Sequence, residues 1–398
     1  MKFAVSSVNT SPFKVNHLFT FSAKTWLTTY FINFYFLWGV FLPFWGIWLT
    51  GQGVTTEQVG VLFSIGLVLR FLSSLTVLPQ VSTGKGILNL IRCLAFIILL
   101  CFATLLFLKG DVWLAGLTLL INFLIGPMMP LGDIVGSRLV KQINLDYGRV
   151  RLWGSVSFIA GSTTIGWLIV DFGLQAILAL IIITSAIMWL LSLANLNPML
   201  VDKKEKKTIK KQSILKLLKN REVILFVLIA GMIQGSHGAY YAFSTIYWDS
   251  IGISGSIIAW LWAIAVFAEI LILRFNSRLF ANWSIKQMLL LALIGGIVRW
   301  GALSLTGNVY LLGIMQTLHG LTFAVAHLAA IRYISQQQAS QLVSYQSLYS
   351  GVALGLLTAL FTFIAGMTYE SLQGDLFMLS ALLLLPVFIF LKLWKVNS

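Results

Sequence analysis

The sequence predicts an all-α membrane protein with twelve transmembrane helices in two pseudo-symmetric six-helix halves. Hydrophobic residues make up 59% of the 398 positions, whereas charged residues make up 10%. A soluble domain carries roughly 25% charged residues, so this chain has too little polar surface to fold in water. Apolar runs long enough to cross a bilayer recur along the whole chain. The third observation is a weak internal repeat, which relates the first half to the second.

Apolar runs between turn and charge signals predict twelve helices. Several are longer than the bilayer is thick, which allows them to tilt or to extend beyond it. Residues 126–130 (Gly-Pro-Met-Met-Pro) predict a kink in the fourth helix. Small residues at 235, 236 and 238 permit close packing or bending in the seventh. The predicted helices are 26–50, 58–80, 86–108, 112–140, 150–170, 174–196, 222–248, 255–278, 286–306, 309–334, 343–367 and 374–395.

The distribution of charge predicts the orientation of the chain and argues against a nucleic-acid partner. The formal net charge is +15, but Lys and Arg gather in alternate connections, as they do in cytoplasmic loops of membrane proteins. Both termini are therefore expected in the cytoplasm, with the protein in a bacterial inner membrane. Residues 1–25 are predicted as a tail and not a signal peptide, since no cleavage site follows a proper apolar core. The basic segment 200–221 is a predicted linker between the halves 26–199 and 222–398, the second of which ends in a short cytoplasmic tail.

Two segments support the internal repeat because they align at a constant offset. The aligned pairs are Phe44 and Phe243, Trp48 and Tyr247, Gly53 and Gly252, and Thr55 and Ser254. Parallel repeats of this kind place a transporter's substrate site between the halves, near the bilayer midplane. The same offset sets Arg70 against Glu269, and we expect these two charges to meet across a central cavity. A second offset sets Asp133 against His327.

Ionisable residues inside the predicted helices point to transport. A charge is costly at bilayer depth, so it is kept where it faces a partner, a substrate or a water-filled cavity. Glu269, His319 and His327 are candidates for carrying a coupled proton, since both side-chain types bind and release one. His319 and His327 are expected on one face of their helix. A structural ion pair of Glu269 with Arg299 and neutral packing roles for the histidines are the alternatives, and the spacing argues against a metal site.

The fourth and fifth helices hold a second group of polar residues. Asp133 follows the predicted kink, and the run from Tyr147 opens the fifth helix with two arginines. We expect Arg149 at the cytoplasmic rim and Arg151 reaching inward to pair with Asp133. The alternative is that both arginines only set the topology.

These residues resemble the major facilitator superfamily, and within it the lactose-permease-like proton symporters. The run Tyr147-Gly-Arg-Val-Arg-Leu-Trp-Gly154 looks like the motif whose second arginine, here Arg151, pairs with a helix-four carboxylate. Glu269, Arg299 and His319 stand at positions similar to that family's proton and coupling residues. The resemblance implies the major facilitator fold.

The chain departs from the sugar carriers at Thr322, where they have a carboxylate, and at Gln316, which replaces a lysine. A closer resemblance, to the phenylpropionate permease family, covers nearly the whole chain. The segments that carry it are Phe41-Leu-Pro-Phe-Trp45, Leu145-Asp-Tyr-Gly-Arg-Val-Arg-Leu-Trp-Gly-Ser155, Gly238-Ala-Tyr-Tyr-Ala-Phe-Ser-Thr-Ile-Tyr-Trp248, Val298-Arg-Trp-Gly301 and His327-Leu-Ala-Ala-Ile-Arg-Tyr-Ile334.

This resemblance implies a secondary active transporter, not an enzyme, that imports 3-phenylpropionate or a related aromatic monocarboxylate together with a proton by alternating access. Arg299 or Arg70 would then bind the substrate carboxylate, and aromatic side chains would contact its ring. We expect a monomer in the lipid bilayer, with no metal and no cofactor, driven by the proton gradient. The candidate substrate-binding residues are Arg299, Arg70, Asp133, Arg151, Tyr240, Tyr241 and Trp300.

Other functions fit parts of the sequence. A nucleoside or oligosaccharide proton symporter on the same scaffold is the alternative within the class. From another class, a membrane-embedded enzyme acting on a lipid-linked substrate is conceivable, although the chain has no catalytic dyad with recognised spacing and no phosphate-binding loop. A sensor is a third alternative, but the predicted linker is too short for a signalling domain.

Overall fold

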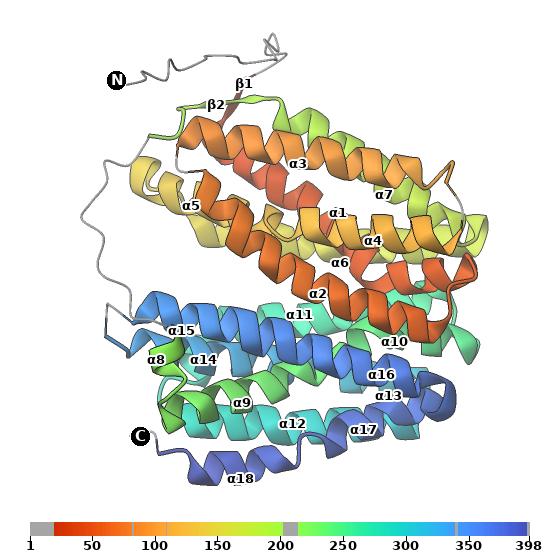
Figure 1. Cartoon of the computed structure of the whole chain (residues 1–398), viewed down its shortest axis with the longest axis vertical. Helices are drawn as coiled ribbons and strands as arrows, with labels where there is room; N and C mark the ends of the chain where they lie inside the picture. The colour runs from red at the N-terminus through yellow and green to blue at the C-terminus, as the bar shows by residue number, and fades with distance from the viewer. Residues whose placement is uncertain (1–19, 82, 109, 202–213, 339–340, 396–398) are drawn as a thin grey trace, which may run out of the picture.

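The computed structural model describes residues 20–81, 83–108, 110–201, 214–338 and 341–395. The predicted N-terminal tail up to residue 19 and most of the predicted linker, 202–213, lie outside these ranges. Within them the chain is helical apart from turns and one short pair of strands (Figure 1).

The helices run back and forth across the view of Figure 1, roughly at right angles to the longest axis of the molecule. The first half contains α1 (Ala23–Gly51), α2 (Thr56–Val77), α3 (Gly84–Thr104), α4 (Asp111–Ile125), α5 (Met128–Ile143), α6 (Tyr147–Phe172) and α7 (Gln175–Ser192). After the short α8 (Ile214–Leu217), the second half contains α9 (Arg221–Gly235), α10 (His237–Ser250), α11 (Gly255–Leu279), α12 (Ile285–Leu305), α13 (Val309–Thr317), α14 (Ala326–Ser335), α15 (Leu342–Leu348), α16 (Thr358–Leu372), α17 (Leu376–Leu382) and α18 (Pro386–Leu393).

Eleven helical runs in the described ranges are long and apolar enough to cross a bilayer, and the last of them accounts for two crossings. This run, Ser344–Leu393, has 50 residues. As one straight helix it would extend about 75 Å, more than twice the thickness of a hydrocarbon core. The chain instead reverses at Gln373–Asp375, where Gln373 has φ 45°, so α16 and α17 belong to successive crossings. The predicted twelve-helix fold is confirmed.

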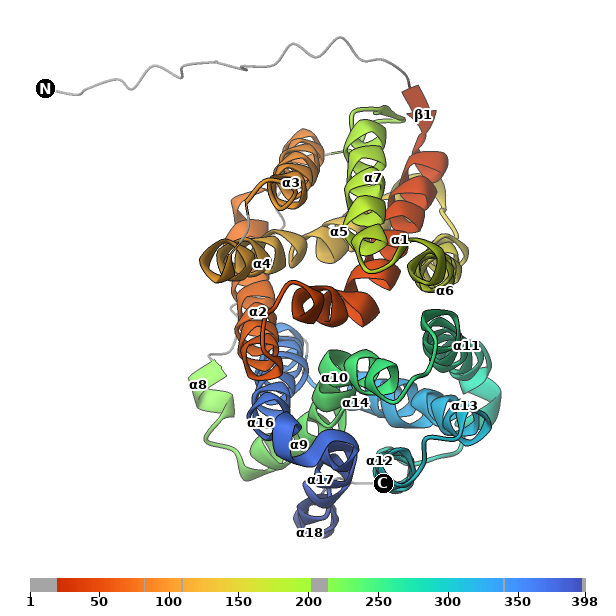
Figure 2. The same ribbon diagram turned by 90° about the vertical axis from the view of Figure 1, so that its right-hand side faces the viewer.

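The two halves have equivalent local structure. Figure 2 shows α1–α7 on one side of the molecule and α9–α18 on the other. Gly53, after α1, has φ 93°, and Gly252, after α10, has φ 83°. Such positive φ values favour glycine, which has no Cβ. The following helices begin at Thr56 and Gly255, at the same offset that aligns the two glycines.

Two of the interrupted membrane crossings have a side-chain hydrogen bond at the break. α4 and α5 are separated at Pro127, which lacks the N–H that a continuous helix needs, so the predicted kink is confirmed. Beside it, the Tyr30 hydroxyl donates to the Met128 carbonyl at 2.6 Å. The break between α9 and α10 falls at Ser236, whose hydroxyl oxygen accepts from the Trp300 indole at 2.9 Å.

Some element boundaries differ from the prediction. The helix expected over 174–196 ends at Ser192, because Arg92 donates to the Ser192 carbonyl at 2.9 Å and to the Ala194 carbonyl at 3.3 Å. The chain then forms β2 (Asn195–Asn197), which pairs in parallel with β1 (Thr20–Ser22). Two π-helical segments were also not predicted: Gly320–Val325 lies between α13 and α14, and Tyr349–Leu357 between α15 and α16.

The halves pack closely at the end of the bundle opposite to the start of α1 and the end of α18, called here the opposite end. Glycines allow this approach: a Cβ added at Gly60 would lie 2.5 Å from the Cα of Gly366 in the other half, and one added at Gly166 would lie 2.6 Å from the Gly255 carbonyl oxygen. One helical turn from the contact of Gly60 with Gly366, the hydroxyl of Thr56 in α2 donates a hydrogen bond to the carboxylate of Glu370 in α16.

Candidate functional site

A cavity of 510 Å³ lies between the two halves. Its size falls within the roughly 300–1,000 Å³ range of small-molecule sites. Helices of both halves supply its wall, including charged side chains that a membrane helix keeps only where they have a partner or a use. The polar and aromatic lining includes Trp38, Arg70 and Arg151 from the first half and Tyr241, Glu269 and His319 from the second.

Most of the predicted site residues line this cavity, and the others lie behind or beside it. Those in the wall are Glu269, His319, His327, Arg70, Arg151 and Tyr241. Those outside the wall are Asp133, Arg299, Tyr240 and Trp300.

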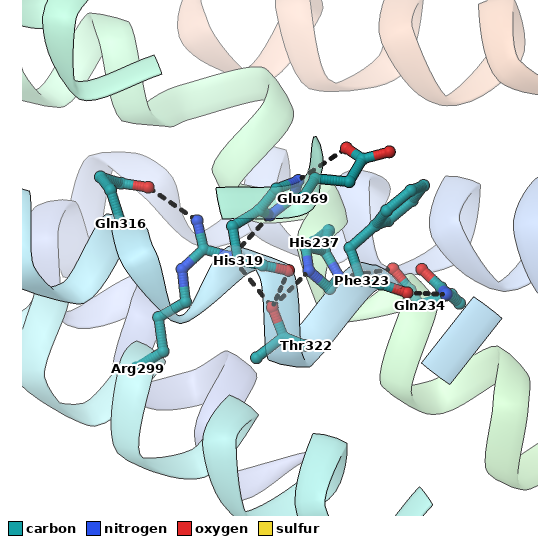
Figure 3. A network of polar contacts seen from close by, with 8 residues as sticks. All are labelled: Gln234, His237, Glu269, Arg299, Gln316, His319, Thr322 and Phe323. Atoms are coloured by element: carbon teal, nitrogen blue, oxygen red, sulfur yellow. Dashed lines mark hydrogen bonds and ion pairs between the residues drawn. The ribbon is translucent and has the colours of Figure 1, made fainter. Parts of the chain in front are cut away.

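Glu269 and Arg299 are connected through His319 and do not form a direct ion pair, which the sequence left open as an alternative (Figure 3). Glu269 Oε2 lies 3.9 Å from His319 Nε2, and Arg299 Nη1 lies 3.0 Å from Nδ1 of the same ring. A guanidinium only donates, so Nδ1 accepts and the proton of the neutral ring is on Nε2, facing Glu269. Protonating the ring would turn Nδ1 into a donor that faces the donor Nη1 at 3.0 Å, and the hydrogen bond would be lost. His319 is therefore neutral in this arrangement.

Arg299 is fully buried, with 0% exposure, and is surrounded by neutral partners. It donates to Gln316 Oε1 at 2.8 Å and to Thr322 Oγ1 at 3.3 Å. Its guanidinium carbon lies 4.7 Å from the ring centre of Tyr240 and 4.4 Å from that of Trp300. No carboxylate of the described residues lies within 4.0 Å of it. The alternative of a structural ion pair between Glu269 and Arg299 is thus not found among the described residues, and the Arg299 side chain is separated from the cavity by its own partners.

Arg70, on α2, has the opposite surroundings. It lines the cavity, and its guanidinium carbon lies 4.9 Å from the ring centre of Trp38. Its Nε has no hydrogen-bond partner, and no carboxylate in the described ranges lies within 4.0 Å. The expected meeting of Arg70 with Glu269 does not occur: equivalent positions in the repeat place them in walls supplied by different halves.

Asp133 and Arg151 do not form the expected ion pair either. Asp133 Oδ1 accepts a hydrogen bond from the Tyr147 hydroxyl at 2.6 Å, and no described cation lies within 4.0 Å of it. Arg151, one turn further along α6, lies over the ring of Tyr35, at 4.2 Å from its centre. There it lines the cavity, and its charge attracts Glu269 in the other half from beyond ion-pair distance. Tyr147, at the start of α6, is therefore the partner of Asp133 instead of the predicted Arg151.

His319 and His327 share the cavity-facing side of their crossing, as their spacing predicts. Phe323 stacks between them, with ring centres 5.4 Å from His319 and 6.3 Å from His327. His327 Nδ1 lies 2.9 Å from the hydroxyl of Tyr349. The described ranges contain no group of three or more His, Cys, Asp and Glu side chains that could hold a metal ion.

Sequence reasoning missed His237 and Gln234. Both are buried, with exposures of 0% and 2%. His237 contacts Thr322, and the Gln234 amide donates to the Phe323 carbonyl, within a π-helical segment, at 3.1 Å. The signal was present, because two polar residues three positions apart in an apolar membrane helix are costly unless they have a role. The prediction used that stretch only as a place for bending.

Comparisons with known proteins agree with this architecture. The model of the MFS_1 like family matches residues 25–379. The "Probable 3-phenylpropionic acid transporter" of Escherichia coli (strain K12) is 38% identical over 91% of this chain and 95% of its own length. The maltose permease of Geobacillus stearothermophilus is 24% identical over 65% of each chain.

Solved structures share the fold. The crystal structure of the nucleoside transporter NupG superimposes with a TM-score of 0.80 over 95% of this chain and 100% of NupG, at 17% identity. A bacterial homolog of the human lysosomal transporter Spinster gives a TM-score of 0.63 over 93% of this chain and 96% of its own, at 11% identity. These relatives are transporters and not enzymes. The chain thus belongs to the MFS_1-like family, and is a multi-pass membrane transporter of the major facilitator type.

Proposed function

We propose that this transporter imports 3-phenylpropionate or a related aromatic monocarboxylate together with a proton. The observation that carries the proposal is Arg70, a cation in the cavity wall that lies against an indole ring and lacks an acidic partner in the described ranges. The name of the 38% identical relative supports the choice of substrate.

Arg70 is the proposed ligand of the substrate carboxylate. A guanidinium binds a carboxylate through two parallel hydrogen bonds, and such charge-assisted bonds are about twice as strong as neutral ones. Trp38, already beside the guanidinium, and Tyr241 in the opposite wall are the proposed contacts of the aromatic ring. In this proposal Arg299 does not contact the substrate but orients His319.

Glu269 is the proposed carrier of the coupled proton. Its side chain is 25% exposed and lines the cavity, so it can exchange protons with water there. His319 has no free acceptor for that proton, because its Nδ1 already accepts from Arg299. His327 does not contact Glu269 within 4.0 Å and is the less favoured candidate.

The proposed coupling step changes the attraction between the halves. Ionised Glu269 attracts Arg151 across the cavity, and protonation removes that attraction. Because one residue belongs to each half, the proton state of Glu269 would bias how the halves rock during alternating access. In this proposal the structure corresponds to the conformation of the cycle in which the halves are closed at the opposite end, where they pack closely.

The orientation in the membrane and the chain boundaries remain part of the proposal. We place the termini and the described part of the linker 200–221 in the cytoplasm of a bacterial cell, with the halves 26–199 and 222–398 in the inner membrane and the protein working as a monomer without cofactor. Support comes from connections at the end that holds the start of α1, which carry Lys85, Lys141, Arg149, Arg278, Lys286 and Arg332. The opposite end carries Glu57, Asp111, Asp171, Asp249, Glu370 and Asp375.

Uptake by vesicles that contain the purified full-length protein tests the proposal. An inward proton gradient should drive accumulation of labelled 3-phenylpropionate. Glu269→Gln should keep substrate exchange between the two sides of the membrane but lose gradient-driven accumulation. Glu57→Gln, which changes an exposed carboxylate in the first half, is the matched control and should accumulate normally.

Each part of the proposal fails separately in this experiment. Full accumulation by Glu269→Gln would remove Glu269 from coupling, and uptake that ignores the gradient would exclude proton symport. No binding of any aromatic acid would exclude the substrate class.

A nucleoside substrate is the second candidate, favoured by the structural likeness to a nucleoside transporter at a TM-score of 0.80. Arg70, which has no acidic partner within 4.0 Å among the described residues, argues against a neutral substrate. Competition by nucleosides or neutral sugars, with no effect of carboxylates, would reverse this choice.

A further inference from the structure

Behind the cavity wall, polar side chains continue inward from His319 in a connected network (Figure 3). Arg299 Nη1 lies 3.0 Å from His319 Nδ1 and 3.3 Å from Thr322 Oγ1. Thr322 Oγ1 lies 3.0 Å from Nε2 of His237. On the far side of its ring, His237 Nδ1 lies 3.1 Å from the backbone carbonyl of Gln234. His237, Thr322 and Arg299 are all fully buried and do not line the cavity.

The chemistry of the end groups fixes the direction of every hydrogen bond in this network. A backbone carbonyl only accepts, so His237 carries its ring proton on Nδ1 and its Nε2 is an acceptor. Thr322 therefore donates its single hydroxyl hydrogen to His237 Nε2, which is closer than the alternative acceptor, the His319 carbonyl at 3.4 Å. The Thr322 oxygen then accepts from Arg299, which donates to His319 as well.

The same arginine thus contacts His319 directly and reaches His237 through Thr322, two buried histidines of opposite tautomer whose ring centres lie 5.3 Å apart. His237 is the Nδ1–H form, and His319 is the Nε2–H form that faces Glu269 at 3.9 Å. One nitrogen of Arg299, Nη1, makes both contacts, so the position of Thr322 determines where the other hydrogen of Nη1 points. Thr322 in turn is held by His237.

We propose that His237 is a positioning residue: through Thr322 it orients Arg299, which holds His319 as the tautomer that presents an N–H to Glu269. This rests on the proposed role of Glu269 in carrying the proton. Its consequence is that a proton on Glu269 finds no free acceptor in the buried network, since His319 Nδ1 and His237 Nε2 are both occupied. The network keeps the coupled proton at the cavity surface.

Nitrogen NMR of the full-length protein labelled with ¹⁵N-histidine tests the tautomers directly. The chain has only four histidines, and His17→Gln and His327→Gln identify the signals of the other two by subtraction. An unprotonated ring nitrogen resonates far downfield of a protonated one, so each tautomer has its own pattern. We expect an Nδ1–H pattern for His237 and an Nε2–H pattern for His319 at neutral pH. The same tautomer in both residues, or a cationic His319, would overturn the proposal.

Variants then test whether His237 does the positioning. Thr322→Val and His237→Leu each interrupt the hydrogen-bond network, and we expect His319 to populate both tautomers in each variant. Thr322→Ser keeps the hydroxyl and His237→Gln keeps an acceptor for it, so both should restore the single Nε2–H pattern. If His319 is unchanged in Thr322→Val, the positioning role is refuted. Should His237→Leu fail to fold, the Val and Ser variants of Thr322 still decide the question.

The outcome is independent of the transport measurement. Opposite tautomers with normal accumulation by Glu269→Gln would leave this assignment intact and refute the coupling role of Glu269. Mixed tautomers in the unmodified protein, with Glu269→Gln uncoupled, would refute only the positioning proposal.

Discussion

Arg70 and Arg299 are both arginines in membrane-spanning helices, one in each half, yet they differ in their hydrogen-bond partners and in their access to the cavity. Arg299 donates to three neutral acceptors, lies against two aromatic rings and is separated from the cavity. Arg70 lies against one ring and lines the cavity. In the described ranges the Nε of each arginine lacks a hydrogen-bond partner, so the difference lies in the remaining contacts and in access to the cavity.

The difference teaches how to separate a structural cation from a binding one in such a protein. A buried charge is tolerated when its hydrogen-bonding groups are satisfied by the protein, as they largely are around Arg299. A cation without such partners, beside a space large enough for a small molecule, is a candidate to bind a partner from outside the protein. This contrast favours Arg70 as the residue that meets an anionic substrate.

The largest expected effect is a difference in stability between variants of the two arginines. Arg299→Ala leaves His319, Gln316 and Thr322 without their donor in a buried site, and each buried acceptor left unsatisfied typically costs about 1–3 kcal/mol, so the loss should exceed about 3 kcal/mol. Arg70→Ala removes one cation–π contact, so it should cost only about 0.5–2 kcal/mol. Thermal unfolding of both variants in one detergent measures the difference, and equal shifts would contradict the assignment of roles.

A second prediction sharpens the comparison at the level of affinity. Arg70→Lys keeps the charge but loses the two-pronged geometry, so the affinity for 3-phenylpropionate should fall about 10- to 100-fold, equivalent to about 1.4–2.8 kcal/mol. Trp38→Leu should cost less, about 0.5–1.5 kcal/mol, through the lost ring contact. Calorimetric titration of the purified variants measures both.

The control for these affinities is Trp113→Phe, which changes an exposed tryptophan of the same half that does not line the cavity. Its affinity should equal that of the unmodified protein. Unchanged binding by Arg70→Lys would remove Arg70 from the substrate site.

The smallest expected effect concerns a second pair of corresponding contacts. Tyr147 donates to the carboxylate of Asp133 in the first half, whereas the Tyr349 hydroxyl contacts the imidazole of His327 in the second. Hydrogen bonds to charged groups contribute about 1.5–3 kcal/mol and neutral ones about 0.5–1.5 kcal/mol. Tyr147→Phe should therefore lower the unfolding temperature more than Tyr349→Phe; the reverse order would indicate a neutral Asp133 or a charged His327.

Sequence patterns predicted the fold because they record what the bilayer and the chain geometry impose. Apolar length gave the helices, and proline gave the break between α4 and α5. The repeat correctly aligned the turns at Gly53 and Gly252. It also made positions 70 and 269 equivalent, but equivalence within a repeat places two residues in matching helices and says nothing about the distance between them.

The partners of the charged side chains were the unpredictable part. The partner of each charged group depends on which neighbouring side chain lies within hydrogen-bond distance of it. Tyr147, for example, donates to Asp133, whereas Arg151 stacks on Tyr35. A helical pattern defines the face on which a residue lies but not the reach of its side chain. The π-helical segments were missed for a similar reason, because they arise from packing between helices and have no distinct apolar period.

The short parallel pair of β1 and β2 has a practical consequence for protein engineering. It joins the residues just before α1 to those just after α7, in the register Thr20 to Asn195, so the chain of the first half starts and finishes at one point on its own surface. Residues 1–201 and 202–398 can therefore be produced as two polypeptides without cutting through this pairing. Such a split version would show whether the two halves assemble when they are not covalently linked.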